Sequence, residues 1–304
     1  MTAVILEKRA VPAFVNIQGG KRKMKKGKKA AKIIGCLILA AALGTGVWLA
    51  SVRIASKKHN LITLDTSSVP EPVSGPESEG DVQLSEVKMH YAVYGKGGPA
   101  LVLIHGNARN HKDLDETARY LANSYTVYSI DSRCHGESSD PGVISYDLMA
   151  KDVKEFIEKM KLEKPYLVGH SDGAIVGLTV AYTYPDLLGG LVSCGANSRP
   201  DTFKPRFTIY VKINNKRHPD KLNDMMLEQP QMTKDDLAKI KCPTYVVAGE
   251  FDIMDLSDTV FIHESIPGSK IAVVKNADHS TYIMHNGKQA YALIDAYLKT
   301  LTAV

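Results

Sequence analysis

The sequence predicts a single α/β domain over residues 82–304, and three features support this fold class. After about residue 100, short apolar runs alternate with longer stretches of helical periodicity. The apolar runs, such as ALVLI at 100–104 and TYVVA at 244–248, are continuous, which is typical of parallel strands covered on both faces. Polar residues also gather directly after five of these runs, where open α/β sheets bind their ligands.

The net charge of +5 conceals an uneven distribution along the chain. Residues 1–58 hold 13 Lys or Arg and one acidic residue, so their net charge is +12, and the rest of the chain has a net charge of −7. An acidic domain is a poor partner for nucleic acid, so we expect no nucleic-acid binding. We assign 1–32 to a basic cytoplasmic segment. The stretch MKKGKKAAKIIG, typical of a bacterial membrane anchor, makes Met24 the expected true start.

Residues 33–52 carry no charge and are rich in Leu, Ile and Ala. Twenty helical residues span about 30 Å, the thickness of a bilayer core, so we expect a transmembrane signal-anchor helix. The excess of Lys and Arg before this stretch puts the N-terminus in the cytoplasm and the domain outside the cell membrane. The alternative is a cleaved signal peptide and a secreted domain.

Residues 53–81 include SSVPEPVSGPESEGD, in which Pro, Ser, Glu and Gly dominate. We expect a flexible linker here, because this composition lacks the apolar residues that a packed segment needs.

Beyond the linker, strands and helices are expected in alternation. The expected strands are 82–94, 100–104, 125–130, 165–169, 190–194, 243–248 and 270–274. The expected helices are 113–123, 147–161, 173–184, 257–265 and 286–300. The alternation breaks over residues 195–241, which we expect to form a short cap over the strand ends.

The polar residues after the strands include a serine, an aspartate and a histidine in that order. Ser171 stands in GHSDG, which fits G-x-S-x-G, between a strand and a helix. Asp252 follows the strand TYVVA within GEFD, and His279 follows the last strand within NADHS. These motifs, with their order and their positions at strand ends, resemble the α/β-hydrolase superfamily, and small bacterial esterase-like members in particular. One departure is Cys134, where relatives usually have glycine.

The resemblance implies a catalytic triad with Ser171 as nucleophile, His279 as base and Asp252 as the acid that orients it. His105 and His135 are rival bases, and Asp255 and Asp258 are rival acids, by residue type alone. The implied oxyanion hole consists of the backbone N–H groups of Asn107 and Asp172. We expect the carboxylate of Asp172 to cap the helix that follows, at the positive end of its dipole.

The expected function is that of a serine hydrolase that cleaves a carboxylic ester of a small or medium-sized substrate through an acyl-enzyme. The same triad could act instead on a thioester, an amide or a C–C bond, or the fold could serve as a non-catalytic binding module. No metal or dinucleotide motif is present, so we expect no cofactor. Cys134, Cys194 and Cys242 show no metal-binding spacing, and the expected strand order places Cys134 too far from Cys194 for a disulfide. The oligomeric state is not indicated.

The cap segment 199–221 has a net charge of +5 within this otherwise acidic domain. One interpretation is a solvated helix face. The other is a basic pocket mouth that attracts an anionic substrate or rests on anionic lipid.

The predicted topology has a direct test. Protease added to intact cells should cut the chain within 53–81 and release the domain, because the charge asymmetry places this segment outside. Protection of the segment in intact cells, with cleavage after lysis as the control, would place the domain in the cytoplasm.

Overall fold

The computed structural model describes residues 61–284 and 286–302. Residues 1–32, the apolar stretch 33–52, Met24 and the first part of the predicted linker lie outside the described residues. No helix within the described part of the chain is long and apolar enough to span a bilayer.

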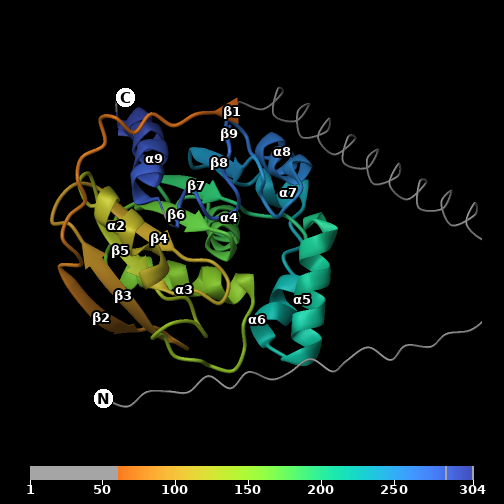
Figure 1. Cartoon of the computed structure of the whole chain (residues 1–304). Helices are drawn as coiled ribbons and strands as arrows, with labels where there is room; N and C mark the ends of the chain where they lie inside the picture. The colour runs from red at the N-terminus through yellow and green to blue at the C-terminus, as the bar shows by residue number, and fades with distance from the viewer. Residues whose placement is uncertain (1–60, 285, 303–304) are drawn as a thin grey trace, which may run out of the picture. The chain divides into compact units, whose positions relative to one another are not determined.

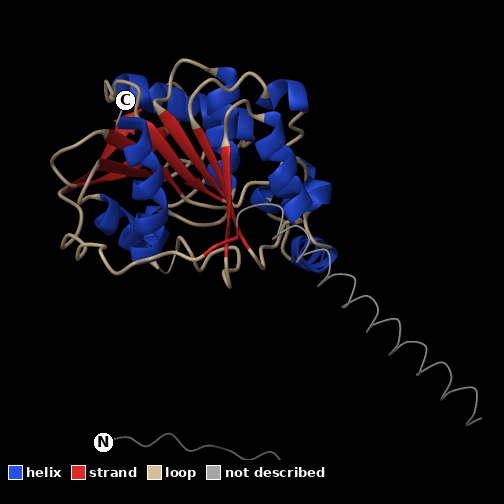
Figure 2. Ribbon diagram, turned by 90° about the horizontal axis from the view of Figure 1, so that it is seen from above, coloured by secondary structure: helices blue, strands red, loops and turns tan. Residues whose placement is uncertain are grey.

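A nine-stranded sheet forms the centre of the domain, in the order β1-β9-β8-β7-β6-β4-β5-β3-β2 (Figures 1 and 2). All neighbouring strands pair in parallel except β2 with β3 and β3 with β5, which are antiparallel. The strands are β1 Leu61–Ile62, β2 Ser78–Gln83, β3 Lys88–Tyr94, β4 Ala100–Ile104, β5 Thr126–Ile130, β6 Tyr166–His170, β7 Gly190–Cys194, β8 Thr244–Gly249 and β9 Lys270–Val274. This mostly parallel sheet confirms the predicted α/β class.

Helices cover both faces of the sheet and bury two large apolar clusters. The helices α3, α4, α7 and α8 contribute to one cluster, and α2 and α9 contribute to the other. Their bounds are α2 Asp115–Leu121, α3 Tyr146–Lys159, α4 Asp172–Thr183, α7 Lys234–Leu237, α8 Leu256–Ser265 and α9 Gly287–Thr302. Because both faces are buried, the central strands are apolar throughout, as the continuous runs predicted.

The predicted cap is an insertion between β7 and β8. It contains the short 3-10 helix η2 Pro200–Thr202, α5 Pro205–Arg217 and α6 Lys221–Glu228, followed by α7. Phe203, Val211, Met226 and Met254 form a small apolar cluster of their own beneath it.

Two expectations about the start of the domain need correction. The predicted strand 82–94 is two strands, β2 and β3, joined by a turn in which the N–H of Leu84 donates to the carbonyl of Val87 (2.8 Å). Both of these apolar residues are buried, so the turn does not interrupt the apolar pattern.

The second correction concerns the predicted linker, because its residues 61–81 pack against the domain. The strand β1 pairs with β9, and the N–H of Val73 donates to the carbonyl of Arg119 (3.1 Å). Ile62, Leu64 and Val69 pack against the cluster formed by α2 and α9. A few apolar residues therefore hold a segment whose overall composition is typical of a tether.

Candidate active site

Ser171 lies on a sharp turn between β6 and α4, with backbone angles φ 55° and ψ −118°. A side chain at Gly169 would place its Cβ 2.1 Å from the carbonyl oxygen of Gly173. A side chain at Gly173 would place its Cβ 2.2 Å from the carbonyl oxygen of Ile104 at the end of β4. Only glycine fits at either position, so the two glycines permit the strained turn that presents the serine.

His279 and Asp252 form a hydrogen-bonded pair in the loops after β9 and β8. His279 Nδ1 donates to Asp252 Oδ1 at 2.7 Å, and the Asp252 side chain is 1% exposed. The backbone N–H groups of Gly249 and Ile253 also donate to the Asp252 carboxylate, at 3.1 and 2.7 Å. The carboxylate is therefore held by three donors and fixes which His279 nitrogen carries the proton.

The end of β7 brings the serine turn and the histidine together. The N–H of Ser171 donates to the carbonyl of Cys194 (2.9 Å), and a Cβ added at Gly195 would lie 2.9 Å from Cε1 of His279. His170, which precedes the serine, donates from Nε2 to the carbonyl of His279 (2.8 Å). No hydrogen bond joins Ser171 Oγ to the His279 ring within the described residues. Such contacts often tighten only when substrate binds.

The electrostatics of the pair favour the ionised carboxylate and the protonated imidazole. Burial favours the neutral form of Asp252, but the attraction of His279 and the N–H donors outweigh it, so the pKa of Asp252 is lowered. Burial likewise disfavours imidazolium, but the Asp252 carboxylate outweighs it and raises the pKa of His279 above 6.5. An imidazole in this setting accepts a proton more readily than one that is buried without a carboxylate partner.

The side chains of the rival bases His105 and His135 form hydrogen bonds with backbone groups of loops. His105 donates from Nδ1 to the carbonyl of Gly106 (2.7 Å) and accepts at Nε2 from the N–H of Ser132 (3.1 Å). Its burial lowers its pKa to about 4. His135 donates from Nδ1 to the carbonyl of Arg133 (2.8 Å).

The rival acids also have other partners. Asp255 caps α8 by accepting from the N–H of Ser257, and buried Asp258 accepts from both the N–H and the hydroxyl of Ser198. Among these aspartates, Asp252 is the one that is hydrogen-bonded to His279.

The structure links the two predicted oxyanion-hole residues through their side chains, which the sequence motifs did not indicate. Asn107 Nδ2 donates to Asp172 Oδ2 (2.9 Å) and to the carbonyl of Leu222 in α6 of the cap (3.1 Å). The Asp172 carboxylate therefore bonds a loop side chain. In the described part of the chain no side-chain hydrogen bond caps the start of α4, so the expectation that this carboxylate would cap the helix was wrong. Burial raises the pKa of Asp172. Among the described residues, no backbone hydrogen bond outside the helices and strands comes from the N–H of Asn107 or Asp172, and Asp172 is the first residue of α4, where N–H groups have no intrahelical acceptor.

Cys134, which departs from the usual glycine, keeps a left-handed backbone with φ 63°. Its thiol donates to Asp140 Oδ1 (3.3 Å), and this contact helps to hold the loop in place. Cys134, Cys194 and Cys242 are free thiols within the described residues.

Together these groups provide a strained serine, a base paired with a buried carboxylate, and two candidate N–H donors around the carboxyl ends of β4, β6, β8 and β9. This set can activate a hydroxyl and stabilise an oxyanion, which is the chemistry of acyl transfer.

Comparisons with known proteins identify hydrolases that are similar to this chain. A family model described as the alpha/beta hydrolase fold matches residues 99–239. The chain is 31% identical over 123 residues to the sn-1-specific diacylglycerol lipase ABHD11 of Xenopus laevis, covering 40% of this chain and 39% of that protein. It is 25% identical over 233 residues to the serine hydrolase BPHL of Homo sapiens, covering 66% of this chain and 80% of that protein.

A solved structure shares the fold. The thermophilic esterase from Thermogutta terrifontis superposes with a TM-score of 0.60 at 21% identity, covering 74% of this chain and 99% of that one. Identity at this level shows the fold alone.

The ion pair predicts a measurable pKa for His279. In an NMR titration of the full-length chain, the pKa of the His279 imidazole should be raised above 6.5, and Asp252→Asn should lower it. The shift is downward because burial, which opposes the charged ring, then acts without the compensating carboxylate. A His279 titration that Asp252→Asn leaves unchanged would contradict the pairing.

Proposed function

The chain is a member of the α/β-hydrolase superfamily, and from that premise we propose that it is a serine hydrolase that cleaves carboxylic esters of small or medium-sized substrates. The observation that carries the proposal is the 2.7 Å hydrogen bond between His279 and Asp252, in a site that also contains Ser171 on its strained turn. The names of the relatives, a diacylglycerol lipase among them, support ester substrates.

In the proposed reaction, Ser171 Oγ attacks the ester carbonyl and His279 Nε2 takes the hydroxyl proton. The N–H groups of Asn107 and Asp172 stabilise the oxyanion that forms, each by roughly 3 kcal/mol in the transition state. His279 then gives its proton to the leaving alcohol, which leaves an acyl group on Ser171. Water, deprotonated by His279, releases the acid and restores the serine.

Two alternatives remain open to experiment. The same triad could act on a thioester, an amide or a C–C bond, because the choice of bond depends on the pocket more than on the fold. A non-catalytic binding module is the other alternative, and the intact Ser171, Asp252 and His279 argue against it. Turnover of a panel of matched esters, thioesters and amides would separate these possibilities.

We also propose that residues 33–52 anchor the chain in the cell membrane, with the domain outside the cytoplasm. The support is the uncharged run of twenty residues and the basic residues that precede it. A cleaved form would be secreted instead.

The cap presents a helix face that suits an anionic partner. On α5, the exposed Ile209, Tyr210 and Ile213 are 57%, 66% and 49% exposed. The cationic Lys212, Lys216 and Arg217 lie on the same helix. Positive charge beside apolar side chains favours an anionic, partly apolar substrate, and we propose that the cap raises the local concentration of such esters.

The nucleophile is tested by covalent labelling. A fluorophosphonate probe should label the full-length chain at Ser171, and Ser171→Ala should abolish labelling and lower ester turnover about 10⁴-fold or more. His279→Ala should do the same, because the hydroxyl then lacks its base. Ser257→Ala, an exposed serine on α8, is the matched control and should label as the wild type does. Labelling that survives Ser171→Ala would refute this nucleophile.

The cap proposal is tested by ionic strength. The kcat/KM for an anionic ester should fall as salt rises, while that for a neutral ester of the same acyl length should not, since salt at 0.1 M screens charges beyond about 10 Å. Replacing Lys212, Lys216 and Arg217 with Gln should remove the difference. Replacing Lys159, Lys161 and Lys164 removes the same charge and should not, because these residues precede the central strand β6, at the end opposite the carboxyl ends that carry the site. An equal response of both esters to salt would mean that the basic cap is only a solvated face.

A further inference from the structure

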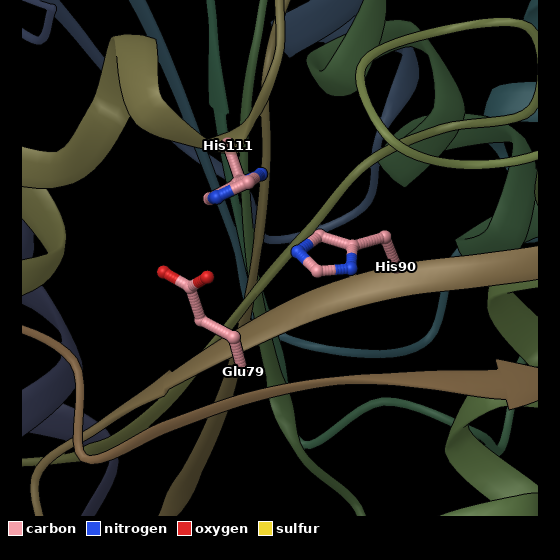
Figure 3. Close-up of side chains that lie close together, drawn as sticks. All are labelled: Glu79, His90 and His111. Atoms are coloured by element: carbon pink, nitrogen blue, oxygen red, sulfur yellow. The ribbon is translucent and has the colours of Figure 1, made fainter.

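A second cluster of polar side chains lies near the edge of the sheet formed by β2 and β3. It consists of Glu79 from β2, His90 from β3 and His111 from the 3-10 helix η1 His111–Leu114. One ligand atom from each residue lies within 4.8 Å of the other two, and Figure 3 shows the three side chains facing a common space. The two imidazole rings have centroids 5.1 Å apart.

The two histidines share an unusual feature, which is a buried ring nitrogen without a partner. His90 is 7% exposed and His111 is 1% exposed, and Nε2 of each has no hydrogen bond among the described residues. The nearest carboxylate oxygen to His90 Nε2 outside the cluster is Glu137 Oε2 at 3.9 Å, too far for a hydrogen bond. Buried polar atoms are nearly always satisfied, so two unsatisfied nitrogens in one place point to a missing partner.

The opposite nitrogen of each ring is held by a carboxylate. His90 Nδ1 donates to Asp81 Oδ1 and His111 Nδ1 donates to Asp131 Oδ1, each at 2.9 Å. Asp131 also accepts from the N–H of His111 (2.6 Å) and from that of Glu137 (2.8 Å), so this carboxylate is fixed. A proton on Nδ1 leaves the lone pair of Nε2 free, which is the state that a metal-binding histidine requires.

We propose that Glu79, His90 and His111 bind a divalent transition-metal ion, with Zn²⁺ as the best fit. Two imidazoles and one carboxylate suit zinc and its neighbours in the first transition row, whereas Mg²⁺ and Ca²⁺ prefer oxygen ligands. Zinc bonds of about 2.0–2.2 Å bring donors to roughly 3.3 Å from one another. Glu79 is exposed and can move inward to meet this distance, and Glu137 is placed to approach as a fourth ligand.

The location suggests what the ion does. His111 lies in the segment after β4 that also carries Asn107, and Asp131 begins the loop after β5. An ion bound here would tie the β2–β3 hairpin to the segment that supplies one proposed oxyanion donor. The ion would therefore have a structural role, which does not depend on whether the chain hydrolyses esters.

Calorimetry on the full-length chain tests the site. After treatment with a chelator, the chain should bind one Zn²⁺ saturably, and Glu79→Gln and His90→Gln should each weaken binding at least about tenfold. Asp81→Asn, which removes the partner of His90 Nδ1, should weaken it by about 10- to 100-fold. Hydrogen exchange should show that Zn²⁺ protects amides in β2, β3 and residues 105–114.

Two matched controls exclude adventitious binding. Glu77→Gln removes a neighbouring glutamate that pairs with Lys96, and His218→Gln removes an exposed histidine in the cap. Both variants should bind Zn²⁺ as the wild type does. If a histidine variant fails to fold, Glu79→Gln decides the test. Glu79 is exposed, so this variant should fold, and circular dichroism can verify that it does. Absence of saturable binding, unchanged binding in Glu79→Gln, or loss of binding in His218→Gln would overturn the proposal.

Discussion

The close approach of three backbone segments is the constraint on which the rest of the site depends. The turn after β6 folds back so tightly that Gly169 faces the carbonyl of Gly173, which in turn faces the carbonyl of Ile104 at the end of β4. Side chains at these two positions would push the turn away from the neighbouring strand and lower the serine out of the site. The backbone strain at Ser171 is tolerated because the residues on either side are fixed. β6 is paired with a strand on each side, and α4 begins directly after the serine.

The sequence motifs predicted the hydrogen-bonded pair of Asp252 and His279, because both residues follow the carboxyl ends of strands. Parallel strands bring their carboxyl ends to one edge, so the order of Ser171, Asp252 and His279 along the chain was enough to predict that Asp252 meets His279. The link from Asn107 to Asp172 was not predictable, because it depends on how a loop, a helix start and the cap meet in space. The same holds for Glu79, His90 and His111, since their convergence requires that β3 lie beside β5 in an antiparallel sense. The segment 61–81 was misjudged because its mean composition hides the few apolar residues that pack against the domain.

The candidate active site and the cluster of Glu79, His90 and His111 are connected by one segment, residues 105–114. Residues 105–114 hold His105 and Asn107 at one end and His111 at the other, and Asp131 holds His111 from the next loop. Asn107 also reaches the cap through the carbonyl of Leu222, so a shift of α6 would change the surroundings of Asp172. A substitution in the hairpin or in the cap can therefore affect the serine turn without touching it.

The pairing of β1 with β9 has a mechanical consequence. The chain enters the described domain at Leu61, and the first ladder it joins is the two-residue contact with Val273 and Val274, extended by the hydrogen bond from Lys275 N–H to the carbonyl of Ile62. The loop after β9 carries His279, so tension on the chain before Leu61 would load the strand next to that loop in shear. The apolar contacts of Leu64 and Val69 and the bond from Val73 to Arg119 follow β1 along the chain. They would therefore bear load only after β1 had separated from β9, so the strand that precedes the His279 loop would be loaded first.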